Sequence, residues 1–189
     1  VKLADVTIPE TVTEIGNSAF AGCGFSEFAV PSRISRLGYS AFFSCANLKS
    51  IRLPESISDI PVGCFQDCAA LTSVSLPDNL KSIEENAFLR CASLASIAIP
   101  EGVTVIGSHA FDGCAGLTQI RMPQEMKTLG KSAFQNCSSL QTVRIPAGIT
   151  QLQSYTFYGA GLESVEIPEG VTAIGDYVFA GCEALKSVT

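Results

Sequence analysis

Seven of the eight cysteines recur at a regular spacing, and they are the first residues in this sequence that suggest chemistry. Thiolates bind zinc, form disulfides and act as nucleophiles. The sequence holds no C-x-x-C pair, however, and zinc sites usually contain one. Each regular cysteine follows a phenylalanine by three residues: Cys23, Cys45, Cys68, Cys91, Cys114, Cys137 and Cys182.

We favour a buried ladder of small side chains for these cysteines, because free cysteine is among the most buried residue types. Ala160 takes the same place in one repeat, which suits a packing role. On the outer side of a curved stack, neighbouring cysteines are expected to lie beyond the ~7 Å between Cα atoms that a disulfide tolerates. Cys64, four residues before Cys68, stands outside the series, and a bond or reactivity there stays open.

The other reactive side chains form no catalytic motif. His109 is the only histidine, and its place in the other repeats is mostly polar, so we expect a solvent-facing side chain. Gly130-Lys131-Ser132 lacks the first glycine of a phosphate-binding loop, because Glu125 stands there. The sequence therefore predicts no catalytic residue, no cofactor and no resident metal.

A column of acidic residues is the remaining chemical candidate. A solvated turn explains this column better than paired catalytic carboxylates do, and a Ca²⁺ site is the weaker alternative because the column is interrupted by Ser32, Gln124 and Ala147. Each of its members directly follows a proline: Glu10, Glu55, Asp78, Glu101 and Glu169.

These columns exist because the whole chain is a repeat with a period of 22 or 23 residues. A fixed period in this range is typical of a solenoid, and we number its coils 1 to 8 by their prolines. A phenylalanine lies eleven residues after every one of these prolines. The prolines are Pro9, Pro31, Pro54, Pro77, Pro100, Pro123, Pro146 and Pro168.

Each coil follows the pattern L-x-x-I-x-I-P-x-x-V-x-x-I-G-x-x-A-F-x-x-C. The I-x-I step alternates with period two and predicts a short strand, which the proline ends. Stacked coils would join eight such strands into one parallel sheet. V-x-x-I predicts a second extended or turn segment, and A-F-x-x-C a single helical turn on the opposite side. A glycine before that turn predicts a positive φ: Gly16, Gly38, Gly107, Gly130 and Gly175.

Composition excludes several classes of function. Apolar residues make up 47% and charged residues 16% of the chain, which excludes intrinsic disorder. The net charge is -6, without a basic stretch for nucleic acid or an anionic membrane surface. No apolar run reaches the ~18 residues of a membrane span, so we predict no membrane insertion in this segment.

The repeat resembles the leucine-rich repeats of the BspA-like, Treponema pallidum type, over essentially all 189 residues. The resemblance implies an α/β solenoid: a right-handed leucine-rich repeat superhelix of eight coils, with a parallel sheet on one face and short extended or helical turns opposite. It also implies an extracellular or cell-surface protein that adheres to host matrix or cell-surface proteins. Residues 1–189 are expected to form one leucine-rich repeat domain, cut from a longer protein because neither end carries a polar capping repeat.

The outward side chains of the predicted sheet are the candidate binding surface, on a face that is normally concave in such solenoids. Two arginines occupy neighbouring coils there, and like charges about 4.8 Å apart favour a polar or anionic partner unless a nearby acid offsets them. The candidate partner-binding residues are Gln119, Arg121, Thr142, Arg144, Glu166 and Arg52. We expect a non-enzymatic protein-binding or adhesion module. The alternatives are a passive spacer or stalk and, more remotely, a β-helix-like polysaccharide-active enzyme.

Overall fold

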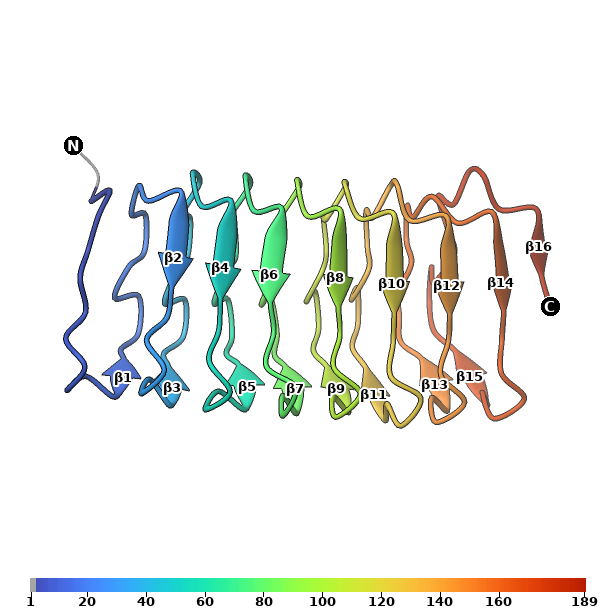
Figure 1. Cartoon of the computed structure of the whole chain (residues 1–189). Coiled ribbons are helices and arrows are strands. Elements are labelled where there is room, and N and C mark those ends of the chain that lie inside the picture. Colours follow the sequence, from blue (N-terminus) through green and yellow to red (C-terminus); the bar gives the residue numbers. More distant parts are fainter. Residues whose placement is uncertain (1–2) are drawn as a thin grey trace.

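The computed structural model describes residues 3–189 as a single stack of coils, with the two ends of the chain at opposite ends of the stack (Figure 1). Each coil from the second to the eighth contributes one strand of three residues to one side. These strands are β2 (Glu27–Ala29), β4 (Ser50–Arg52), β6 (Ser73–Ser75), β8 (Ser96–Ala98), β10 (Gln119–Arg121), β12 (Thr142–Arg144) and β14 (Ser164–Glu166), and β16 (Ser187–Val188) extends the row.

A second row of two-residue strands lies where the sequence predicts the V-x-x-I segment. These strands are β1 (Glu14–Ile15), β3 (Arg36–Leu37), β5 (Asp59–Ile60), β7 (Ser82–Ile83), β9 (Val105–Ile106), β11 (Thr128–Leu129), β13 (Gln151–Leu152) and β15 (Ala173–Ile174). Every pairing in both rows is parallel and joins equivalent residues of consecutive coils, such as Ile120 with Val143. The predicted stack of repeats with parallel sheets is therefore confirmed.

The long row is not the single eight-stranded sheet that the sequence predicts. It divides into β2–β4–β6 and β8–β10–β12–β14–β16, and within residues 3–9 the first coil forms no strand. That coil has a neighbour on one side only. The short row divides at other places, into β1–β3, β5–β7–β9–β11 and β13–β15. Because β7 pairs with β9 beside the gap between β6 and β8, no gap runs through both rows.

The core is a set of ladders that run along the stack. The phenylalanines of coils 2 to 7 are fully buried, and consecutive rings stack with centroids 5.3–5.7 Å apart. At the two ends Phe20 and Phe179 are half-buried, because each lacks a covering coil. The leucine, isoleucine and valine columns fill the space between the two rows of strands. One coil cannot bury its own apolar edge, so the stacking supplies the burial.

The A-F-x-x-C segment is not the helical turn that the sequence predicts, and residues 3–189 contain no helix. Its alternate N–H groups bond to the next coil rather than to the preceding turn, as when Phe42 N donates to the Cys64 carbonyl at 2.9 Å. The intervening groups close isolated turns, such as Cys45 N to the Phe42 carbonyl at 3.2 Å. Hydrogen bonds between coils use the backbone N–H groups that a helix would need, so no helix forms in this segment.

Positive φ angles occur in two columns, neither of which is the glycine column that the sequence indicated. They lie two residues before and two residues after each phenylalanine, as at Ser40 (φ 54°) and Ser44 (φ 56°). The glycines of the predicted column do not have a positive φ; a Cβ on Gly107 would instead lie 2.5 Å from the Glu85 backbone nitrogen in the coil before it. Glycine suits that column because the backbone of the preceding coil passes too close for a Cβ atom. The residues with positive φ in the turns are mainly serine, asparagine and other glycines.

Candidate functional site

The cysteine column is buried, as predicted: among the regular cysteines only Cys23, in the first coil, is half-exposed. Each thiol from Cys45 onward also has a polar role. It donates a hydrogen bond to the carbonyl of the phenylalanine in the coil before it, as Cys137 Sγ does to Phe111 O at 3.2 Å. Ala160 fills the same place without that bond. The column therefore joins coils as well as filling space.

The wide separation predicted between neighbouring cysteines is wrong. Hydrogen-bonded backbones join consecutive coils on this side, so equivalent residues lie about 4.8 Å apart. The thiols of Cys45 and Cys68 are close enough to influence each other electrostatically, yet no disulfide joins any of the eight cysteines. Burial raises the pKa of the Cys114 thiol to about 12 and that of Cys64 above its ordinary value. These groups stay protonated at neutral pH, which makes them poor nucleophiles and poor metal ligands.

The single histidine lies on the turn corner, where it has a positive φ of 54°. Its Nδ1 lies 3.0 Å from Asp112 Oδ2, and within residues 3–189 its ring makes no hydrogen bond to a hydroxyl or thiol. Ser132, from the phosphate-loop fragment, is buried and lies in the same turn column as His109. The described part of the chain holds no group of three or more histidine, cysteine or acidic side chains suited to a metal ion.

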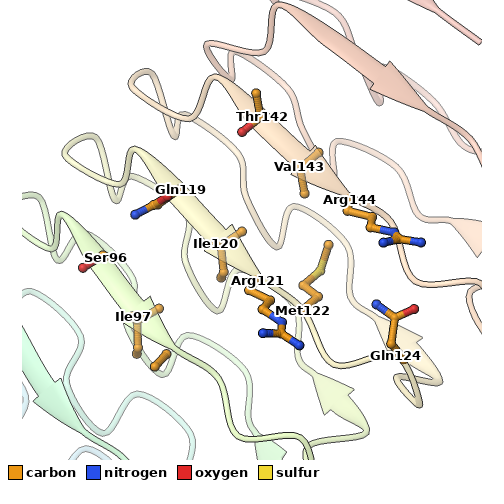
Figure 2. A pocket seen from close by; sticks show the side chains of 11 residues that line it. Ser96, Ile97, Gln119, Ile120, Arg121, Met122, Gln124, Thr142, Val143 and Arg144 are labelled. Atoms are coloured by element: carbon orange, nitrogen blue, oxygen red, sulfur yellow. The ribbon is translucent and has the colours of Figure 1, made fainter.

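The long row of strands carries all six candidate binding residues. A hollow of about 750 Å³ crosses β8, β10 and β12, open to solvent (Figure 2). Ser96, Gln119 and Thr142 lie at one end, and Arg121 and Arg144 at the other, as Figure 2 shows. The alternation of a strand produces this arrangement: Ile120 points into the core while the residues before and after it point outward.

The two arginines of the hollow differ in their electrostatic partners. Arg121 reaches back to the acidic column of the preceding coil, where its Nη2 lies 3.1 Å from Glu101 Oε1. Arg144 lies opposite Glu166 in the register of β12 and β14, yet the two form no ion pair. Among residues 3–189, Arg144 has no ion-pair partner. Its exposed guanidinium therefore retains its charge and all of its donors for a partner.

The structure brings together four of the six candidate binding residues, since Gln119, Arg121, Thr142 and Arg144 all line the hollow. We call these four the β10–β12 patch. Glu166 lies on the next strand, outside the hollow, and Arg52 belongs to the separate sheet of β4. Two residues that sequence reasoning left out also matter here: Gln124 lines the hollow, and Glu101 holds Arg121.

The signal for Glu101 was present in the repeat itself. Glu101 directly follows Pro100, and Arg121 comes two residues before Pro123, the proline of the next coil, so stacking of consecutive coils can bring the two side chains together. The sequence pattern alone did not connect Glu101 with Arg121, because the two residues belong to different coils.

Among residues 3–189 there is no helix of the length and hydrophobicity needed to cross a lipid bilayer.

Comparison with known proteins agrees with the geometry. A family model of the BspA type leucine-rich repeat region matches residues 1–118 and 104–189. The crystal structure of a T. pallidum leucine-rich repeat protein is 31% identical, with a TM-score of 0.70, and the match covers 92% of this chain and 78% of that one. No curated protein sequence matches the chain significantly.

Two further crystal structures show the same fold at lower identity. A leucine-rich repeat protein from Bacteroides ovatus is 23% identical with a TM-score of 0.58, covering 98% of this chain and 66% of that one. The pneumococcal vaccine antigen PcpA is 20% identical with a TM-score of 0.65, covering 94% of this chain and 56% of that one. The repeat pattern, the coil geometry and the family match together show that the chain belongs to the BspA type leucine-rich repeat family.

Proposed function

We propose that this chain is a non-enzymatic protein-binding module of an extracellular or cell-surface protein, and that its partner docks on the β10–β12 patch. The observation that carries the proposal is the hollow across β8, β10 and β12, at whose edge Arg144 has no ion-pair partner among residues 3–189. Solenoids present extended surfaces suited to binding. Among residues 3–189 the regular thiols are mostly buried, and His109 contacts Asp112 but no hydroxyl or thiol that it could activate. A solenoid of the same fold is a vaccine antigen, which supports a surface location.

A passive spacer is the second candidate, and the middle of the sheet face favours it. The outward residues of β6, which lies outside the hollow, are small and uncharged: Ser73 and Ser75. A spacer needs only the stacked core and a soluble surface, and this part of the face provides no anchor for a partner.

Reversal of the two patch charges separates the two candidates. The chain is immobilised, and binding of purified extracellular matrix proteins is measured by surface plasmon resonance. Arg121→Glu/Arg144→Glu is expected to weaken binding at least tenfold, because the partner then meets like charge. Arg33→Glu/Lys127→Glu changes the net charge equally at exposed residues outside the hollow and is expected to leave binding unchanged.

Equal binding by the wild type and the patch variant would exclude the β10–β12 patch as the docking surface. Absence of binding by the wild type to any matrix protein or to intact host cells would favour the spacer.

A further inference from the structure

The acidic column has no acidic residue in the two coils whose strands carry Arg121 and Arg144. In most coils an acid follows the proline, but Gln124 and Ala147 stand there in the coils of Arg121 and Arg144. Arg52 has no such gap, because Glu55 follows the proline of its own coil. In a chain of net charge -6, β10 and β12 therefore carry two outward arginines whose own coils lack the acid of that column.

Glu101 pairs with one of the two arginines and leaves the other without an acidic partner among the described residues. Glu101 pairs with Arg121 at 3.1 Å, but the side chains are 64% and 83% exposed, so the pair is weak and readily exchanged. Arg144 has no ion-pair partner among the described residues, although Glu166 faces it across β12 and β14. Two guanidinium groups on consecutive strands are thus available to anions from one partner.

We propose that the β10–β12 patch recognises an acidic segment of a partner polypeptide, with neighbouring carboxylates on Arg121 and Arg144; this inference rests on the proposed function. A guanidinium binds a carboxylate through two parallel N–H···O bonds, which gives direction as well as attraction. In an extended peptide, side chains on one face recur about every 7 Å. Consecutive strands lie closer together, about 4.8 Å apart, but the long arginine side chains can spread to reach two acids on one face of such a segment.

The surroundings of the patch favour a polypeptide over a densely charged polyanion such as a sulfated glycan. Glu101 pairs with Arg121 and Glu166 faces Arg144 across β12 and β14, so these two acids would repel a partner of high negative charge density. The other end of the hollow offers Ser96, Gln119 and Thr142, whose hydroxyl and amide groups suit backbone N–H and C=O groups. A segment with a few carboxylates among neutral residues fits both ends.

The test uses two fluorescent twelve-residue peptides of glycine and serine. One carries two glutamates separated by one residue, and the other carries glutamines at the same places. Binding to the whole chain is followed by fluorescence anisotropy at several salt concentrations. The glutamate peptide is expected to bind at least tenfold more tightly, with an affinity that falls as salt rises. Arg144→Ala is expected to weaken it about tenfold, and Arg144→Lys to restore part of the loss.

A charge-neutral replacement of Glu101 gives the sharpest test, because it predicts a gain. Glu101→Gln frees Arg121 and is expected to strengthen glutamate-peptide binding severalfold. Glu10→Gln changes the net charge by the same amount in the same column, four coils before the nearest coil of the hollow, and is expected to have no effect. Equal gains in the two variants would show a nonspecific charge effect and overturn the proposal.

Two other results would also overturn it. Equal binding of the glutamate and glutamine peptides would refute carboxylate recognition. If matrix proteins still bound through the β10–β12 patch in that case, the proposed function would hold without this inference. Heparin that binds more tightly than the glutamate peptide, and loses that binding in Arg144→Ala, would assign the patch to a sulfated glycan.

Discussion

Truncation of Phe111 tests the stacked core most directly. The ring is fully buried between Phe88, with centroids 5.3 Å apart, and Phe134, at 5.4 Å, and it lies within 7° of parallel to both. Burial of such a side chain contributes about 1.5–3 kcal/mol, and each stacked neighbour adds about 0.5–1.5 kcal/mol. Phe111→Ala leaves a cavity that the two neighbouring coils cannot both close. We expect it to lower the free energy of unfolding by about 3–5 kcal/mol.

Phe179→Ala is the matched control at the end of the same ladder. Phe179 is half-buried and stacks on Phe157 alone, with centroids 5.9 Å apart. Its truncation is expected to cost about 1–2 kcal/mol, because less surface returns to water and one stacked contact is lost instead of two.

Both variants are measured by equilibrium unfolding in guanidinium chloride. Far-UV circular dichroism follows the whole stack, and tyrosine fluorescence of a Tyr39→Phe background follows the last two coils, which contain the other three tyrosines, Tyr155, Tyr158 and Tyr177. Coincidence of the two transitions licenses a two-state free energy. A loss below 1 kcal/mol for Phe111→Ala, or equal losses for the two variants, would refute the argument that ladder stacking holds the coils together.

Other predictions concern the glycine column and the thiols. Gly107→Ala is expected to destabilise the fold by about 1–3 kcal/mol, because its Cβ would meet the Glu85 backbone, whereas Gly16→Ala, which meets nothing within 4 Å, should stay within about 0.5 kcal/mol in the same unfolding assay. Native protein at pH 8 should expose at most Cys23 to a thiol reagent, and guanidinium should expose all eight cysteines; rapid reaction of several native thiols would contradict the buried ladder. Stability should fall as pH rises from about 9 to about 12, because the unfolded chain loses the Cys114 proton first, and a flat pH profile across that window would contradict the raised pKa.

The binding surface was only partly predictable. The alternation of the I-x-I step places Arg121 and Arg144 outward on neighbouring strands, and this follows from sequence periodicity alone. Their unequal pairing does not follow, because a rotamer of Arg121 selects Glu101 from the preceding coil while Arg144 and Glu166 stay apart. Side-chain choice among several exposed acids depends on distances that a repeat pattern does not contain.

The stacked architecture and its buried columns were determined by the sequence itself. A period of 22 or 23 residues, with an apolar residue at each fixed offset, leaves stacking as the way to remove those side chains from water. The full burial of Phe42 and Cys45 follows from that periodicity.

Only the tertiary structure decided how the backbone turns between the strands. The pattern A-F-x-x-C suits a helical turn when one coil is considered alone, but in the stack the Phe42 N–H bonds to the Cys64 carbonyl of the next coil. This competition also moves the positive φ angles to Ser40 and Ser44 and leaves Gly107 to admit a neighbouring backbone. Hydrogen bonds between coils join residues more than twenty positions apart, so local preferences, which govern single-coil predictions, do not set them.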